Sequence, residues 1–311
     1  YQIGTVWRNE KPGPGRFREF TQIDADIVGS KNNLADAEMC SLISDTLIKC
    51  GLEKKDFVIN LSNRKLIQGL INQLKINSAK QKLTVIRAID KLDRIGISGV
   101  EQLLKKGRKD QSGDFTSGAD LSDAQASEVI NFLKLKDISD IKNILTDKLA
   151  IEGINEIQKI LEGIKYSGYE SQINFNPTVV RGLEYYTGAI FEANLTFKVK
   201  NLKGKEVEFG SIGGGGRYDN LVSRFNKIDL PATGISIGLD RLIFALTQLE
   251  KINYSNKEPI IICILDEKYL PKYYEILKEL RDTDINSEIY LGDSSLKSQL
   301  KYADKRNSPA V

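Results

Sequence analysis

The sequence contains no histidine among its 311 residues. Within these residues, this excludes a histidine general base, histidine metal ligands and a Ser-His-Asp triad. The three cysteines, Cys40, Cys50 and Cys263, are scattered. Their spacing suits neither a metal site nor a disulfide framework, and it favours a reducing compartment. No apolar run approaches the roughly 18 residues that a membrane span requires, so we expect no membrane association.

The composition is that of a globular protein with nearly balanced charge. Hydrophobic residues make up 41% of the chain and charged residues 28%, as in soluble globular proteins. The length allows two or three domains with their own cores. The net charge of +3 permits a nucleic-acid partner but does not argue for one, because a slightly basic solvated surface explains it as well.

Residues 1–28 are predicted to form a β-hairpin, because two stretches of alternating side chains flank a loop rich in Pro and Gly. On the return strand, apolar residues alternate with Gln22, Asp24 and Asp26. Alternate side chains of a strand share a face, so Gln22 and Asp26 must lie together, and an antiparallel partner could add Arg8. A half-exposed sheet with a solvated polar side is the plainer alternative.

Arginines beside a loop and at a helix start are candidates for binding an anion. Arg16 and Arg18 follow the Gly- and Pro-rich loop, where they either clamp a phosphate or merely add solubility. Arg241 falls near the start of a helix predicted over 239–249, off its apolar face. A positive charge there opposes the helix dipole, but it suits an anionic ligand because helix N-termini favour phosphates.

The stretch 181–192, Arg-Gly-Leu-Glu-Tyr-Tyr-Thr-Gly-Ala-Ile-Phe-Glu, is the most informative in the chain. A strand that only fills a core needs alternating apolar residues, and glycine weakens it. Here Ala189, Ile190 and Phe191 follow a cluster of Arg, Glu and Tyr. This order predicts a strand whose leading end lines a polar pocket. Glu184 has no assigned role beyond that of a structural partner for a neighbouring arginine.

Four successive glycines at 213–216 precede Arg217, Tyr218 and Asp219. Such a run costs conformational entropy and packs no side chain, so its usual reason is a close approach of backbone to a ligand or to another strand. A flexible surface loop is the alternative, but the Arg-Tyr-Asp that follows argues against it. The spacing fits neither the GxGxxG fingerprint nor a Walker loop.

Sheet-rich and helical segments alternate along the chain. Residues 1–63 and 169–252 carry the strand signals, and residues 64–168 are almost entirely helical in pattern. The apolar stripes of this helical segment are expected to be core, and no catalytic constellation is evident in it. Residues 257–311 follow a β-α-β-α pattern that predicts a separate small domain.

These motifs resemble those of the histidyl-tRNA synthetases. Residues 181–188, together with Gly-Gly-Arg-Tyr-Asp at 215–219, resemble the histidine-specific motifs of that family. Residues 7–22 resemble motif two of the class II synthetases, and residues 234–242 resemble motif three. The resemblance covers essentially the whole chain, in the family's order and with its helical insertion.

The resemblance implies an α+β fold, with a class II antiparallel sheet and flanking helices. Residues 1–63 and 169–252 would form the catalytic core, residues 64–168 a helical insertion domain, and residues 257–311 a truncated α/β anticodon-binding domain. The family's motif one and the end of its anticodon domain have no counterpart in the sequence. We therefore expect an internal piece of a longer protein, with activity and a homodimer expected of the full-length protein.

The resemblance also implies roles for individual residues. It assigns ATP contacts to Arg8, Glu10, Arg16 and Arg241, and histidine contacts to Gln22, Asp26, Arg181, Tyr185, Tyr186 and Gly215. Arg8 and Arg181 are the expected catalytic residues, because two guanidiniums can stabilise the charge that develops on the ATP α-phosphate. The family gives Arg181 a task that other class II enzymes give to a metal. Mg²⁺ is therefore expected with the ATP phosphates, without an assigned protein ligand.

The implied function is a cytoplasmic ligase. It would activate L-histidine with ATP to histidyl-adenylate and transfer it to the terminal ribose of its tRNA, with release of AMP and pyrophosphate. One alternative is a regulatory subunit of ATP phosphoribosyltransferase, which shares the fold but generally loses the motif at 181–188 and parts of motif two. Another is the synthetase-like sensor domain of starvation-responsive kinases, which degenerate ATP arginines would mark. The motifs here, with Arg8 and Arg241, favour the enzyme.

Overall fold

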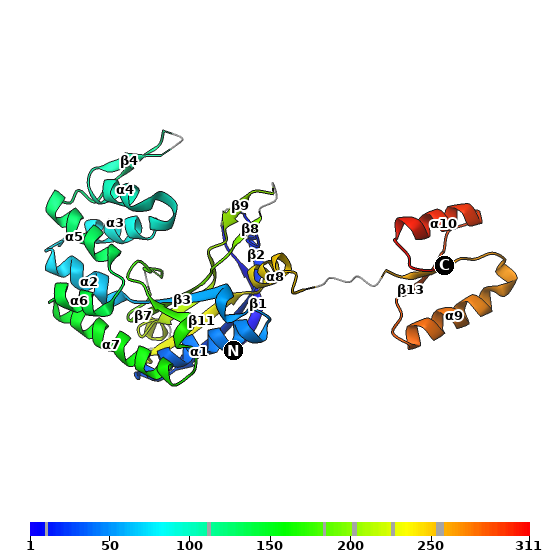
Figure 1. Ribbon diagram of the computed structural model, residues 1–311, viewed down its shortest axis with the longest axis horizontal. Helices are drawn as coiled ribbons and strands as arrows, with labels where there is room; N and C mark the ends of the chain where they lie inside the picture. Colours follow the sequence, from blue (N-terminus) through cyan, green and yellow to red (C-terminus); the bar gives the residue numbers. More distant parts are fainter. Residues whose placement is uncertain (10–11, 111–112, 183–184, 201–203, 225–227, 253–257) are drawn as a thin grey trace. The chain divides into compact units, whose positions relative to one another are not determined.

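The structure is a computed structural model, and it describes residues 1–9, 12–110, 113–182, 185–200, 204–224, 228–252 and 258–311. The chain folds as two units, Tyr1–Lys251 and Ile252–Val311. Figure 1 gives the elements of each unit. None of the described helices is both long and apolar enough to cross a bilayer.

The first unit is built on a seven-stranded sheet with the order β1-β2-β11-β10-β7-β3-β6. The strands are β1 (Gln2–Trp7), β2 (Glu19–Val28), β3 (Phe57–Asn63), β6 (Ile173–Phe175), β7 (Ala189–Leu195), β10 (Ser211–Arg217) and β11 (Ala232–Gly238). Neighbouring strands of this sheet are antiparallel, except that β3 and β6 are parallel. The mainly antiparallel sheet confirms the predicted fold class.

Helices α1 (Leu34–Lys49) and α7 (Lys148–Lys165) pack on one another and on the sheet, and α8 (Leu239–Gln248) packs on β2 and β11. Apolar side chains of these helices and of the central strands fill the core between them. Fully buried examples are Ile43, Leu47, Ile59, Leu61, Ile157, Phe191, Ala193 and Ala245. The core therefore holds the central strands rigidly, and their ends can present polar groups.

The helical segment follows directly from β3. It contains α2 (Arg64–Gln73), α3 (Ala79–Ile89), α4 (Leu92–Leu104), α5 (Asp123–Lys134) and α6 (Ile138–Ile144), with the hairpin β4 (Gly107–Lys109) and β5 (Phe115–Ser117). Polar side chains cap several of these helices, such as Ser122, which forms a capping box with Gln125 at the start of α5. Helices α2 and α7, the first and last helices within residues 64–168, pack along one another, and both contact β3 of the sheet. The boundaries of the four segments expected from the sequence, 1–63, 64–168, 169–252 and 257–311, remain predictions.

A small hairpin, β8 (Lys198–Lys200) and β9 (Glu206–Glu208), lies between β7 and β10 in the sequence. The second unit has two parallel strands, β12 (Ile260–Ile262) and β13 (Ser287–Ile289), with helices α9 (Leu270–Asp282) and α10 (Leu296–Lys305). Ile262, Leu277 and Ile289 form its core. This is the β-α-β-α order that the sequence predicted.

Candidate active site

A cavity of about 690 Å³ is lined by the hairpin β1–β2, by β10, by the start of α8 and by residues 181, 182, 185 and 186. The predicted site residues that line it are Arg8, Arg16, Gln22, Arg181, Tyr185, Tyr186, Gly215 and Arg241. Asp26 is not among its lining residues, and Glu10 lies outside the residues that the structure describes. Motifs that are more than 200 residues apart in the sequence thus meet at one cavity.

The hairpin places Arg8 beside Gln22, which is one of the two arrangements that the sequence left open. Residues Phe20, Gln22 and Asp24 share one face of β2, since side chains alternate along a strand. The guanidinium of Arg8 lies 5.4 Å from the centre of the Phe20 ring and donates to Gln22 Oε1 at 2.9 Å. Gln22 Nε2 in turn donates to Asp24 Oδ1 at 2.6 Å. Arg8 is therefore held at the cavity wall by a chain of polar contacts.

Arg181 pairs with a carboxylate that the sequence reasoning did not identify. Its NH2 lies 2.8 Å from Glu192 Oε1, and its NH1 donates to Ser211 Oγ at 3.2 Å. Burial raises the pKa of Glu192, while Arg181 opposes this rise. The one sequence feature that could have identified Glu192 is its position, because it is a charged residue in the middle of the buried strand β7. Glu184, the suggested partner of an arginine, lies outside the described residues.

Arg241 and the loop that carries Arg16 pack together at the start of α8. Arg241 donates through Nε to Ser211 O at 2.7 Å and through NH2 to Phe209 O at 2.6 Å. These carbonyls offset the unfavourable position of a cation at a helix N-terminus. The loop approaches so closely that a Cβ on Gly15, whose φ is +59°, would lie 3.1 Å from Arg241 Cα. Glycine there brings Arg16 near Arg241.

Tyr185 and Tyr186 both line the cavity, and their ring centres lie 4.4 Å apart. Tyr186 is tightly enclosed, because a Cβ on Gly182 would lie 2.0 Å from its ring and a Cβ on Gly216 would lie 2.9 Å away. Burial raises the pKa of its hydroxyl, and the neighbouring Tyr185 adds to the rise. The neutral phenol is therefore the form present at ordinary pH.

The glycine run lies inside strand β10 and not in a surface loop. Its residues pair on one side with β11 and on the other with β7. A Cβ on Gly215 would lie 1.9 Å from Gly234 O, so these strands approach too closely for a side chain. The expectation of a close backbone approach is thus met by another strand, while Gly213, Gly214 and Gly215 also line the cavity.

Asp26 contacts Tyr218, which lies in the Arg-Tyr-Asp motif but was not predicted as a site residue. The hydroxyl of Tyr218 donates to Asp26 Oδ1. Burial raises the pKa of Tyr218, and the hydrogen bond to Asp26 adds to the effect. Gly234 leaves room for the Asp26 carboxylate, since a Cβ there would lie 1.8 Å from Oδ1. The residues that carry this pair were visible in the sequence, but their pairing was not.

Asp90 and Arg94, from the junction of α3 and α4, also line the cavity. No sequence signal pointed to them, because the helical segment showed only core stripes and solvated charges. Within the described residues, no group of three or more His, Cys, Asp or Glu side chains could hold a metal ion. The cavity wall thus carries five arginines, Arg8, Arg16, Arg94, Arg181 and Arg241, which suits a polyanionic ligand.

Comparison with known proteins gives a consistent answer. A family model described as histidyl-tRNA synthetase matches residues 1–242. The histidine–tRNA ligase of Pelagibacter ubique is 55% identical over 315 residues, covering the whole chain and 68% of that relative. The histidine–tRNA ligase of Bartonella bacilliformis is 44% identical over 324 residues, covering the whole chain and 65% of that protein. The chain therefore spans about two thirds of the length of these relatives.

Solved structures agree with the sequence comparisons. The crystal structure of histidyl-tRNA synthetase from Nostoc sp. PCC 7120 matches with a TM-score of 0.67 at 28% identity, covering 99% of this chain and 68% of that one. A protein from Bacillus halodurans, titled an ATP phosphoribosyltransferase regulatory subunit/histidyl-tRNA synthetase, matches with the same TM-score at 19% identity and supports the fold alone. On the family match over residues 1–242 and the 55% identity, the chain belongs to the histidyl-tRNA synthetase family.

Proposed function

We propose that the protein is a histidine–tRNA ligase. It activates L-histidine with ATP to histidyl-adenylate and then transfers the histidyl group to the terminal ribose of its tRNA, releasing AMP and pyrophosphate. The observation that carries this proposal is that one cavity is lined by Arg8, Arg16, Arg181 and Arg241 together with Gln22, Tyr185 and Tyr186. A cationic wall suits the ATP phosphates, and a polar aromatic wall suits an imidazole.

In the proposed first step, the histidine carboxylate attacks the α-phosphorus of ATP and pyrophosphate leaves. Negative charge grows on the non-bridging oxygens of that phosphate in the transition state. Arg8 and Arg181 stabilise this charge from two sides, and their guanidiniums are already oriented by Gln22 and Glu192. Arg16 and Arg241 bind the remaining phosphates of ATP. Orientation of the two substrates supplies much of the rest of the acceleration.

Histidine recognition is assigned to Gln22, Asp26, Tyr185, Tyr186 and the strand at Gly215. An imidazole offers one donor and one acceptor, so a carboxylate and a phenol hydroxyl can bind its two nitrogens. An analogue that lacks one nitrogen would leave a buried partner unpaired and would bind poorly. The contact between Tyr218 and Asp26 supports this role, because it orients the carboxylate.

The remaining parts of the proposal rest on the family relationship. ATP is a substrate, and Mg²⁺ accompanies its phosphates without an assigned protein ligand. The arginines of the cavity suit the ATP phosphates. Among the described residues that line the cavity, Asp90 is the one carboxylate, so the wall offers Mg²⁺ a single acidic side chain. The tRNA for histidine is the second substrate, a homodimer is the expected assembly of the full-length protein, and the cytoplasm is the expected location.

Histidine-dependent exchange of pyrophosphate into ATP tests the proposal. The full-length protein should catalyse exchange with histidine and not with the other amino acids. Absence of exchange with any amino acid would contradict the enzyme and leave a non-catalytic relative, such as a regulatory subunit. The arginines at the cavity favour the enzyme over that alternative.

A further inference from the structure

Thr187 directly follows the two cavity tyrosines and is bound to the end of β10. Its backbone N donates to Arg217 O at 2.8 Å. Its hydroxyl donates to Asp219 Oδ2 at 3.0 Å and accepts from Asp219 N at 3.1 Å. The same hydroxyl lies 3.4 Å from Arg217 O, so it donates to Asp219 and Arg217 and accepts from Asp219.

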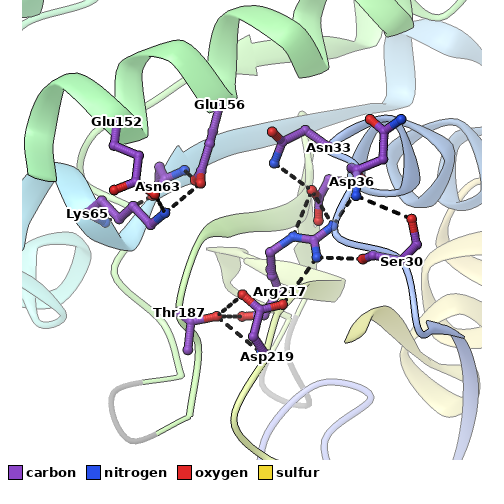
Figure 2. A network of polar contacts seen from close by, with 11 residues as sticks. Ser30, Asn33, Asp36, Asn63, Lys65, Glu152, Glu156, Thr187, Arg217 and Asp219 are labelled. Atoms are coloured by element: carbon purple, nitrogen blue, oxygen red, sulfur yellow. Dashed lines mark hydrogen bonds and ion pairs between the residues drawn. The ribbon is translucent and has the colours of Figure 1, made fainter. Parts of the chain in front are cut away.

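Asp219 is fixed in turn by the buried Arg217. The five N–H groups of Arg217 match five hydrogen bonds: Nε and NH2 to Asp36 Oδ2 at 3.0 and 2.8 Å, NH1 to Asp219 Oδ1 at 3.2 Å, NH1 to Ser30 O at 2.9 Å, and NH2 to Asn32 O at 3.2 Å. Figure 2 shows Arg217 between Asp36 on one side and Asp219 with Thr187 on the other. A guanidinium bound in this way has no freedom to rotate.

The buried charges make this arrangement sensitive to the loss of any member. Asp36 is fully buried, and its second oxygen, Oδ1, has no hydrogen-bond partner among the described residues. Burial acts to lower the pKa of Arg217, but the charges of Asp36 and Asp219 outweigh it and the pKa is raised. The guanidinium therefore stays charged and keeps both carboxylates in place.

Gly188, the residue after Thr187, is enclosed by Arg64, Arg217 and Glu156. Gly188 O accepts from Arg64 N at 2.8 Å, and a Cβ on Gly188 would lie 3.1 Å from Arg217 Cδ and 3.4 Å from Glu156 Oε2. Figure 2 also shows Glu156 held by Lys65 and Asn63, at 2.6 and 2.7 Å. Thr187 is therefore bonded to the Arg217 cluster, and Gly188 is buried between Arg217 and Glu156.

We propose that Thr187, Asp219 and Arg217 are positioning residues for histidine, which act by fixing Tyr185 and Tyr186 at the cavity wall. This inference rests on the proposed function. The three residues touch no substrate in it, since Thr187, Asp219 and Arg217 are absent from the cavity lining. Their contribution is the placement of the two phenol rings, which lie one and two residues before Thr187.

Thr187→Val tests the proposal, because it keeps the shape of the side chain and removes only the hydroxyl. Loss of a hydrogen bond to a carboxylate and of the ordering it gives should raise the KM for histidine in pyrophosphate exchange roughly tenfold. The kcat and the KM for ATP should change less than about twofold, because the phosphate wall is untouched. Thr187→Ser keeps the hydroxyl and should restore the wild-type KM for histidine.

Thr84→Val is the matched control. Thr84 bonds Lys80 O at 2.8 Å within α3, far from this cluster in the sequence, so its removal deletes one hydroxyl contact and should leave exchange kinetics unchanged. A Thr187→Val enzyme with the wild-type KM for histidine would overturn the inference and leave the proposed function standing. A wild-type protein without histidine-dependent exchange would instead contradict the proposed function, and this inference with it.

Discussion

Arg181 and Arg217 belong to neighbouring motifs of one site and occupy opposite environments. The side chain of Arg181 is 44% exposed, and that of Arg217 is 4% exposed. Arg181 contacts Glu192 and Ser211 at the cavity wall, whereas Arg217 places all five donors on protein acceptors. In the proposed function, Arg181 contacts the substrate directly, whereas Arg217 is buried and holds the structure around the cavity. Exposure and partner number distinguish the two, and residue type alone does not.

The largest expected effect is on stability, from Arg217→Ala. It would leave Asp36 buried without its cation, which should lower the free energy of unfolding by about 3–5 kcal/mol. Urea denaturation followed by circular dichroism measures this change. Replacing both partners, as Arg217→Met with Asp36→Leu, should recover most of the loss because no buried charge remains. An Arg217→Ala protein as stable as the wild type would contradict the structural role of Arg217 and with it the contrast with Arg181.

The strand that carries Arg217 should be nearly as intolerant of added volume. Gly215→Ala would place a Cβ 1.9 Å from Gly234 O, a backbone atom that cannot move without disturbing β11. We expect a loss of about 1–3 kcal/mol in the free energy of unfolding, as for other overpacked sites. Gly13→Ala is the control, since a Cβ there meets no atom within 4 Å. Equal stability of the two variants would contradict the tight pairing of β10 with its neighbours.

Removal of the two exposed ion pairs of Glu53 should show the smallest effect. Glu53 lies 2.8 Å from Lys55 and 3.0 Å from Lys251, and the hydrogen bonds to these lysines lower its pKa from 4.5 to about 2. A lowered pKa in the folded state gives stability that is present above pH 4.5 and is lost as the pH falls toward 2. Urea unfolding of Glu53→Gln should therefore differ slightly from the wild type at neutral pH and converge with it near pH 2. A gap that persists at pH 2 would refute this assignment.

Local sequence patterns predicted the hairpin, the helical segment and the polar stretch at 181–192, and the family resemblance named most of the predicted residues that line the cavity. Alternation along residues 22–26 placed Gln22 on the face that Arg8 reaches, and the hairpin fixed their register. The entropic cost of four successive glycines predicted a close backbone approach at 213–216, and the pairing of β10 with β7 and β11 accounts for it. These features depend on residues that are near in sequence or on motifs with a strong steric reason.

Long-range pairings could not be predicted in this way. Arg217 and Asp36 are 181 positions apart, and nothing in the pattern of α1 marks Asp36 as the partner of a distant arginine. Glu192 was visible as an odd residue in a buried strand, but its pairing with Arg181 follows from the order of strands. Arg94 reaches the cavity only through the way the helical segment folds. Such contacts depend on tertiary structure, which periodicity does not encode.

The most direct test of the account is the initial rate of histidine-dependent pyrophosphate exchange by Arg181→Ala, at saturating substrates and with its folded fraction measured alongside. The account predicts a rate lower by about 10²–10³, corresponding to roughly 3–4 kcal/mol of lost transition-state stabilisation, with unfolding close to that of the wild type. An Arg181→Ala enzyme that exchanges at nearly the wild-type rate would contradict the role of Arg181 in the reaction.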